Sequence, residues 1–313
     1  MQPPGVTCPR ARDPRGWPVH RWLEKGVCIM LKGGDKIGIV ASSNGIKEES
    51  TKKVTELVEK LRYLGLEIEF SPYIYRSNSI SNGTGKKRGE ALMKFFKDDN
   101  IKAIFDISGG DLANETLEYL DYNEIKNNPK PFFGYSDISV LLNGIYAKSG
   151  VVTYNYQIRN LVGQFQEEQT KNFRNTIMGN DNDLTNFKYE WIQGNSMEGS
   201  VIGGNIRCFL KLAGTEYMPD FKDKILLLES LGGDVAKMTT YMTQYKHLGA
   251  FKKIKGIILG TFTEMERESY TPNIIEIVKG VVNDPNIPIC KTCDIGHGQD
   301  SKCIEIGEWI KIK

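Results

Sequence analysis

Residues 131–142, PFFGYSDISVLL, predict a short buried strand that runs directly into a helix, with Ser136 at the corner. A serine on such a turn is held in a strained backbone conformation, with its hydroxyl above the sheet edge and the first N–H groups of the next helix beside it. This geometry suits a nucleophile, although Ile138 stands where the G-x-S-x-G pattern has its second glycine. A helix N-cap is the alternative role for this serine, and the local sequence gives the two interpretations equal weight.

The chain that precedes this stretch predicts alternating strands and helices. Apolar runs at 36–41, 66–70 and 101–107 are typical of strands. Apolar residues at helical spacing over 54–64 predict a helix between the first two. This order predicts an α/β fold with a parallel sheet. The loop at 42–45, SSNG, lacks G-x-G-x-x-G, which argues against a dinucleotide site.

The composition limits the class of protein. A chain of 313 residues is long enough for two domains, and no apolar run approaches the ~20 residues of a membrane-spanning helix. The first 29 residues carry five of the 41 basic and two of the 39 acidic side chains, which leaves 36 and 37 in the remainder. A near-neutral remainder gives no electrostatic basis for binding nucleic acid. We therefore expect a soluble protein with neither a nucleic-acid nor a membrane partner.

The segments outside the motif-bearing regions suggest how the chain is organised. Residues 1–29 lack helical or strand periodicity and the apolar core of a secretory signal, so we interpret them as a disordered leader or an artefact of upstream translation. We predict a nucleophile domain over 30–165, a polar crossing over 166–195, and a second domain over 196–313. Six cysteines in a chain of this length do not predict a disulfide framework, and a reduced, cytoplasmic setting fits them best.

Two side chains in the second domain suit catalysis. Glu229 directly follows a strongly buried strand, where a carboxylate is held rigidly and is partly desolvated. Of the three histidines, His20 lies in the leader and His247 at a helix end, where the helix dipole explains it. His297 lies between two glycines on a loop; a structural role is its alternative. With Ser136 these residues form a Ser, Glu, His series, in which imidazole takes the hydroxyl proton and the carboxylate fixes its tautomer.

A glycine turn, Ser108-Gly109-Gly110-Asp111, follows the strand at 101–107. Glycines at the carboxyl end of a parallel strand allow the backbone to approach a ligand closely. The alternative is a tight turn in which Asp111 caps a helix that runs to about residue 120. We expect the backbone N–H groups of Asp137 and of Gly110 or Asp111 to stabilise an oxyanion, with about 3 to 4 kcal/mol per donor.

Six spaced motifs together resemble the LD-carboxypeptidase serine peptidases, including their microcin C immunity branch. The resemblance runs from about Leu31 to the end of the chain. It implies a triad of Ser136, His297 and Glu229 between a Rossmann-like amino-terminal domain and a smaller β-rich carboxyl-terminal domain. It also implies a homodimer and no cofactor. The motifs are GYSDIS (134–139), SGGD (108–111), GGN (203–205), GT (214–215), LLE (227–229) and GHG (296–298).

The resemblance implies a small substrate of one of two kinds. LD-carboxypeptidases remove the terminal D-alanine from muropeptide tetrapeptides during cytoplasmic murein recycling, and this is the activity we expect. The immunity branch cleaves the aminoacyl–nucleotide linkage of processed microcin. Ser139 stands where the family usually has threonine, and residues 230–233 lack the acidic side chains common there, which leaves the substrate preference open. Arg88, Arg159 and Arg207 are candidates to bind a substrate carboxylate, and the sequence does not rank them.

Two alternatives come from other classes of protein. Cys290, Cys293, His297 and Cys303 have the spacing C-x2-C-x3-H-x5-C, close to that of a zinc knuckle. Zinc bound there would prevent His297 from acting as a base, although the predicted strands would separate the four ligands. A non-catalytic binding protein on the same fold is the second alternative.

Overall fold

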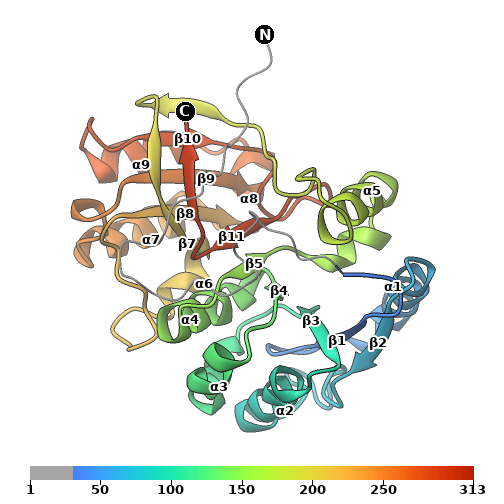
Figure 1. The fold of residues 1–313 in the computed structure, drawn as a ribbon. Helices are drawn as coiled ribbons and strands as arrows, with labels where there is room; N and C mark the ends of the chain where they lie inside the picture. Colours follow the sequence, from blue (N-terminus) through green and yellow to red (C-terminus); the bar gives the residue numbers. More distant parts are fainter. Residues whose placement is uncertain (1–30) are drawn as a thin grey trace.

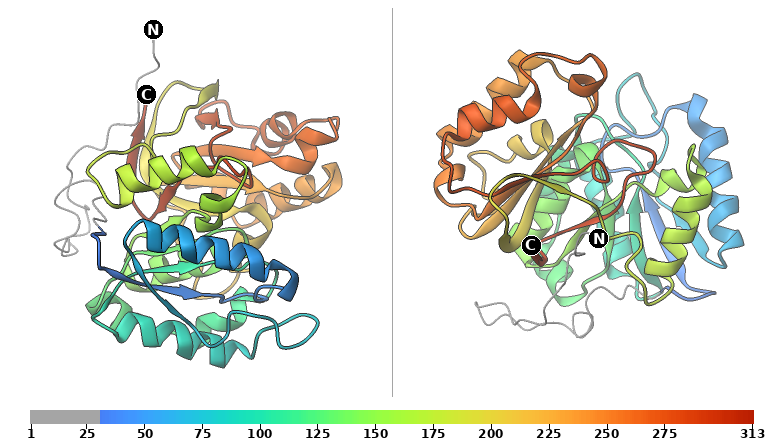
Figure 2. Two further views of the ribbon diagram at one scale, coloured as in Figure 1. Left: turned by 90° about the vertical axis from the view of Figure 1, so that its right-hand side faces the viewer. Right: turned by 90° about the horizontal axis from the view of Figure 1, so that it is seen from above.

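The computed structural model describes residues 31–313, so the predicted leader at 1–29 lies outside the described residues. Two six-stranded sheets form the framework of the described chain. The amino-terminal half, coloured blue to green, and the carboxyl-terminal half, coloured yellow to red, lie side by side (Figure 1; Figure 2). The predicted α/β fold with parallel strands is confirmed.

The first sheet has the strand order β11-β5-β4-β3-β1-β2 and is parallel except for β11. Its central strands β1, β3 and β4 are largely buried, as expected of a parallel sheet with helices on both faces, whereas the edge strand β2 is partly exposed. The strands are β1 (Lys36–Val40), β2 (Glu67–Phe70), β3 (Ile101–Asp106), β4 (Phe132–Gly134), β5 (Thr153–Asn155) and β11 (Ile304–Ile306). The helices are α1 (Thr51–Tyr63), α2 (Gly85–Lys97), α3 (Tyr122–Asn127), α4 (Ser139–Ser149) and α5 (Gln166–Ile177), with 3-10 turns η1 (Glu48–Ser50), η2 (Ala113–Tyr119), η3 (Ser136–Ile138) and η4 (Ile158–Val162).

The second sheet has the order β12-β7-β8-β9-β10-β6, with a parallel centre and an antiparallel strand at each edge. Its central strand β8 is buried along its whole length, as the run of leucines predicts. The strands are β6 (Glu190–Gln193), β7 (Met197–Asn205), β8 (Lys224–Ser230), β9 (Gly256–Phe262), β10 (Ile289–Lys291) and β12 (Trp309–Ile312). The helices are α6 (Ile206–Leu210), α7 (Val235–His247), α8 (Thr263–Arg267) and α9 (Ile274–Val282), with the 3-10 turn η5 (Ala250–Lys252).

One hydrophobic cluster joins the two sheets. It contains Leu141 of α4 and Leu226 of β8, whereas a separate cluster under α1 and α5 contains Phe173. Asn143 of α4 also exchanges two hydrogen bonds, 2.7 and 2.8 Å long, with the backbone of Gly203 in β7. Helix α4 therefore anchors the corner after β4 to the second sheet (Figure 1).

Three segments differ from the sequence-based expectations. The stretch 166–195, expected to be a crossing, contains α5 and β6, and Phe173 of α5 is fully buried. Strand β11, within the stretch 196–313, joins the first sheet by pairing with β5. The helix expected after Asp111 is the 3-10 helix η2, and Asp111 does not cap it because its carboxylate pairs with Arg207. Three of the five buried residues of α5 are polar (Gln169, Asn172 and Thr176), so the hydrophobic pattern of the sequence does not reveal its buried face.

Candidate active site

The corner after β4 has the strained geometry that residues 131–142 predict. Ser136 has a φ of 60°, which is in the left-handed region that favours glycine. A Cβ on Gly134 would lie 2.3 Å from Ile138 Cγ2, so only glycine allows η3 to fold back against the strand. Ser136 does not cap either following helix, because Tyr135 and Ile138 occupy the N-cap positions of η3 and α4. The N-cap interpretation of Ser136 is therefore wrong.

The three side chains selected from the sequence lie in hydrogen-bonding contact. His297 Nε2 lies 3.1 Å from Ser136 Oγ, and His297 Nδ1 lies 2.5 Å from Glu229 Oε2. The side chains of His297 and Glu229 are only 3% and 1% exposed. This arrangement has the order hydroxyl, imidazole, carboxylate that nucleophilic catalysis by serine requires.

Neighbouring groups fix the carboxylate and the imidazole. Asn205, at the end of β7, donates from Nδ2 to Glu229 Oε1 over 3.1 Å, so both carboxylate oxygens are engaged. The Tyr135 ring packs against the His297 imidazole with 4.5 Å between ring centres. Burial raises the pKa of the Tyr135 hydroxyl, and the Glu229 charge raises it further, so this ring stays neutral. Tyr135 and Asn205 lie within the motifs GYSDIS and GGN, but the sequence alone assigns neither of them a role.

The glycine turn after β3 lies beside the nucleophile. A Cβ on Gly109 would come within 3.9 Å of Ser136 Oγ, and one on Gly110 would clash with Asn44 Oδ1 at 2.1 Å. The N–H of Asp111 donates to the same Asn44 oxygen over 2.6 Å. Asp111 N–H is therefore already committed, which leaves Gly110 N–H as the candidate oxyanion donor of this turn, together with Asp137 N–H.

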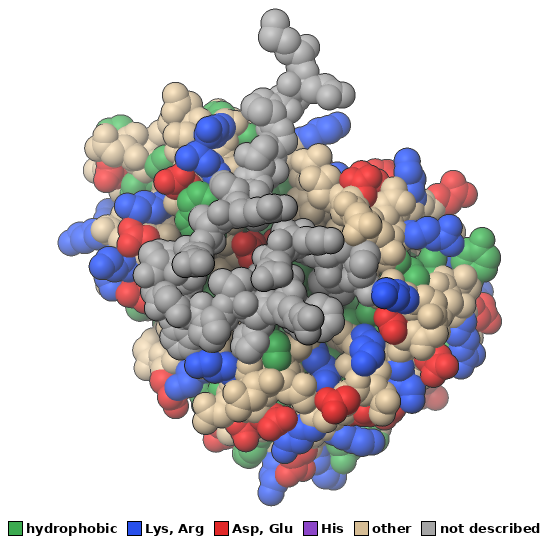
Figure 3. Space-filling view, viewed as in Figure 1, with side chains coloured by type: hydrophobic (Ala, Val, Ile, Leu, Met, Phe, Trp, Pro, Cys, Tyr) green, Lys and Arg blue, Asp and Glu red, His purple; other side chains and the backbone are tan. Residues whose placement is uncertain are grey.

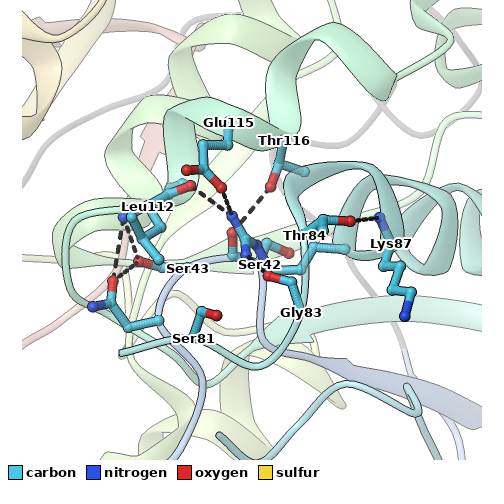
Figure 4. Close-up of polar contacts among 12 residues, drawn as sticks. Ser42, Ser43, Ser81, Gly83, Thr84, Lys87, Leu112, Glu115 and Thr116 are labelled. Atoms are coloured by element: carbon cyan, nitrogen blue, oxygen red, sulfur yellow. Dashed lines mark hydrogen bonds and ion pairs between the residues drawn. The ribbon is translucent and has the colours of Figure 1, made fainter. Parts of the chain in front are cut away.

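The Asp137 carboxylate is a buried junction that the sequence analysis missed. It accepts hydrogen bonds from Ser43 Oγ (2.6 Å) and Ala113 N–H (2.9 Å), and it pairs with Lys211 Nζ at 2.5 Å. Ser43 Oγ also accepts from Leu112 N–H over 3.3 Å, which ties the loop after β1 to the glycine turn (Figure 4). Asp137 thus links four chain segments next to Ser136.

The three candidate arginines have different environments. The Arg88 side chain is fully buried, and both of its terminal nitrogens are engaged: one donates to Gly83 O, and the other donates to Leu112 O and pairs with Glu115 at 2.8 Å, whereas its Nε has no partner within residues 31–313. The close-up in Figure 4 shows these acceptors around the N-terminus of α2. Arg207 is half-exposed and contacts the glycine turn through Asp111 and through Gly110 O at 3.2 Å. Arg159 alone of the three makes no hydrogen bond or ion pair through its side chain within residues 31–313; its Nε is buried and unpartnered.

The zinc-knuckle interpretation is wrong. Cys290, in β10, and Cys303, which precedes β11, are buried in separate hydrophobic clusters, and Cys293 is exposed. Burial also raises the pKa of the Cys290 thiol to about 12, which disfavours the thiolate that zinc requires. Across the described part of the chain, no group of three or more His, Cys, Asp or Glu side chains is arranged to hold a metal ion.

The surface and the helices give two further observations. On the face drawn in Figure 3, basic and acidic side chains of the described residues are interspersed. Within residues 31–313, every helix is too short or too polar to cross a lipid bilayer.

Both halves of the chain match models of known protein families. Residues 37–156 match the LD-carboxypeptidase N-terminal domain, and residues 198–312 match the LD-carboxypeptidase C-terminal domain. The fold and these matches define an enzyme of the carboxypeptidase class. The chain belongs to the LD-carboxypeptidase family, as the six motifs predict.

Relatives of two kinds are similar to this chain over nearly its whole length. The microcin C7 self-immunity protein MccF of Escherichia coli is 25% identical and covers 90% of this chain and 91% of its own. The murein tetrapeptide carboxypeptidase of Pseudomonas aeruginosa is 23% identical and covers 87% and 91%. The crystal structure of an MccF-like protein from Bacillus anthracis superposes with a TM-score of 0.80 at 29% identity, over 90% of this chain and 98% of that one.

Proposed function

We propose that this protein is a serine peptidase that removes the terminal D-amino acid from muropeptide tetrapeptides in the cytoplasm. Ser136 is the nucleophile, His297 the general base and Glu229 the group that orients the imidazole. The observation that carries the proposal is the pair of contacts that His297 makes, 3.1 Å to Ser136 and 2.5 Å to Glu229. Such a pair aligns proton transfer with attack by the hydroxyl.

The reaction proceeds in two halves. In the first, His297 Nε2 takes the Ser136 proton while Oγ attacks the scissile carbonyl, and the N–H groups of Asp137 and Gly110 stabilise the oxyanion. The imidazolium then donates its proton to the departing nitrogen of the D-amino acid, which leaves an acyl-enzyme on Ser136. In the second half, His297 activates a water that hydrolyses this ester. Glu229 accepts a hydrogen bond from Nδ1–H throughout and holds the tautomer that presents Nε2 to the serine.

The test is direct labelling and product analysis. A fluorophosphonate probe is expected to modify Ser136 in the wild-type chain and to leave Ser136→Ala unlabelled. Incubation with a muropeptide tetrapeptide is expected to release D-alanine, read by mass. Failure of the probe to label Ser136 would favour a non-catalytic binding protein instead.

A second candidate function is cleavage of aminoacyl–nucleotide conjugates. The similarity to the microcin C7 self-immunity protein MccF, at 25% identity, and to the MccF-like protein, at 29%, favours it. The same triad serves this reaction, because it also transfers an acyl group from nitrogen to water. Incubation with an aminoacyl sulfamoyl adenosine in a parallel reaction, read by mass, discriminates the two substrates. The expected homodimer is tested by light scattering during size-exclusion chromatography.

A further inference from the structure

The turn η4 contains buried hydrogen-bond donors that lack acceptors. Gln157 Nε2, Arg159 Nε and Asn160 Nδ2 are all inaccessible and make no hydrogen bond within residues 31–313. The Gln157 carbonyl oxygen is used locally, since it accepts from Arg159 N–H over 3.2 Å. Buried polar groups in folded proteins are normally paired, so three orphan donors in four residues mark η4 as a segment whose polar groups the packing of the chain leaves unsatisfied.

Arg159 is the charged member of this set, and its guanidinium makes no direct ion pair within residues 31–313. Burial lowers the pKa of Arg159, but a guanidinium stays protonated at physiological pH. The carboxyl group of Asp106 acts on it only electrostatically, because that group accepts from Ser42 N–H and from Ser108 over 2.6 to 2.8 Å. A desolvated cation without a counter-ion is costly, and an anionic ligand removes this cost.

Two observations place this guanidinium close to the proposed catalytic groups. Arg159 and Glu229 are the two charges that act on the Tyr135 hydroxyl, and the Tyr135 ring packs on His297. The loop that carries His297 also contacts the residues after η4, because Gln299 Oε1 accepts from Gln164 N–H over 2.6 Å. Arg159 therefore lies within electrostatic reach of the site where Ser136 would attack.

We propose that Arg159 binds the free terminal carboxylate of the peptide substrate. This inference rests on the proposed carboxypeptidase function and adds the group that would recognise the leaving amino acid. A carboxypeptidase must distinguish a chain end from an internal bond, and the carboxylate next to the scissile bond is the feature that differs. A guanidinium fork matches a carboxylate with two parallel hydrogen bonds. Arg88 is excluded from this role because both terminal nitrogens of its guanidinium already donate to acceptors of the protein.

The first experiment compares a muropeptide tetrapeptide with its C-terminal amide. Arg159→Gln is expected to lower kcat/KM for the free acid by about 10- to 100-fold, mainly through KM, because a charged hydrogen bond is lost. The rate on the amide is expected to stay within about twofold, so the preference for the acid collapses. Arg159→Lys keeps the charge without the fork and is expected to fall between the two. An unchanged acid-to-amide ratio in Arg159→Gln would overturn the proposal.

The controls separate recognition from damage to the site. Arg174→Gln, on the exposed face of α5, removes an arginine outside η4 and is expected to leave the acid-to-amide ratio unchanged. The rate of fluorophosphonate labelling of Ser136 is expected to be the same in Arg159→Gln as in the wild type. Slower labelling together with equal losses on acid and amide would show a structural role for Arg159 and would contradict the proposal.

A binding measurement keeps this inference separate from the proposed reaction. Calorimetric titration of the Ser136→Ala chain with the tetrapeptide acid, the amide and aspartyl sulfamoyl adenosine needs no turnover. Binding of the acid at least tenfold tighter than the amide, lost in the Ser136→Ala/Arg159→Gln double variant, supports the carboxylate site even if the chain does not cleave the peptide. Equal binding of acid and amide, no binding of either, or an effect of Arg159→Gln on the sulfamoyl adenosine alone would each overturn it.

Discussion

The turns η3 and η4 lie on neighbouring elements of one site and treat their buried polar groups in opposite ways. At η3, the Asp137 carboxylate accepts two hydrogen bonds and pairs with Lys211. At η4, Arg159 Nε and the side-chain amide nitrogens of Gln157 and Asn160 have no partner within residues 31–313. A saturated network fixes a backbone that must not move, whereas unsatisfied donors leave binding capacity for a ligand. The comparison suggests that η3 is built to position a nucleophile and η4 to recognise a substrate.

The variant with the largest expected effect on kcat, Ser136→Ala, tests the role of η3. Ser136→Ala is expected to lower kcat by about 10⁵- to 10⁶-fold, because no other group on the turn supplies a nucleophile. The free energy of unfolding is expected to change little, since the hydroxyl hydrogen-bonds only with His297 within residues 31–313. Steady-state kinetics and urea unfolding of the same preparation measure both. Residual activity above about 1% of wild type would contradict a nucleophilic Ser136.

Substitution of Glu229, which orients the base His297, is expected to have the next largest effect on kcat. Glu229→Gln is expected to lower kcat by about 10³- to 10⁴-fold, because a neutral amide no longer holds the reactive tautomer of His297. Asn205→Ala keeps the carboxylate and removes only its second hydrogen bond, so a loss of about tenfold or less is expected. The two kcat values, measured side by side, test this order; a larger loss in Asn205→Ala would reverse the assigned roles.

Breaking the junction at η3 is expected to affect stability. Asp137→Ala leaves Lys211 Nζ, Ser43 Oγ and Ala113 N–H without their acceptor, and is expected to lower the free energy of unfolding by about 3 to 5 kcal/mol. Asp111→Ala is the matched control, because its ion pair with Arg207 is exposed and is worth about 0 to 1 kcal/mol. Urea unfolding of both variants measures the difference. Equal losses would show that the junction at Asp137 is not specially stabilising.

The smallest expected effect, on the free energy of unfolding, tests whether the polar groups of η4 stabilise the fold. Arg159→Met is expected to leave the free energy of unfolding unchanged or to raise it by about 1 kcal/mol, since an unpaired buried charge is replaced by an apolar chain. Arg88→Met removes a guanidinium whose two terminal nitrogens are hydrogen-bonded and is expected to destabilise the fold by about 3 kcal/mol. Thermal and urea unfolding compare the pair. Destabilisation by Arg159→Met as large as that by Arg88→Met would mean that η4 is a structural turn.

The sequence alone determined the local features of this site. A short apolar strand, Gly134 and a following helix predict the corner at Ser136, because backbone conformation and burial depend on near neighbours. Glu229 was predictable for the same reason, as the polar residue that ends a buried run. The scarcity of histidine then isolated His297. These inferences, and the six motifs, need no knowledge of how the two sheets meet.

The tertiary structure decided what depends on residues far apart in the chain. Packing of α4 between the sheets brings His297 to within 3.1 Å of a serine 161 positions away. It separates Cys290 from Cys303, which sequence spacing had grouped. It commits Asp111 N–H to Asn44 and engages both terminal nitrogens of Arg88, while the Arg159 side chain has no hydrogen bond within residues 31–313. Periodicity and burial report on the neighbours of a residue along the chain, whereas the partners of its polar atoms are set by the packing of the two sheets.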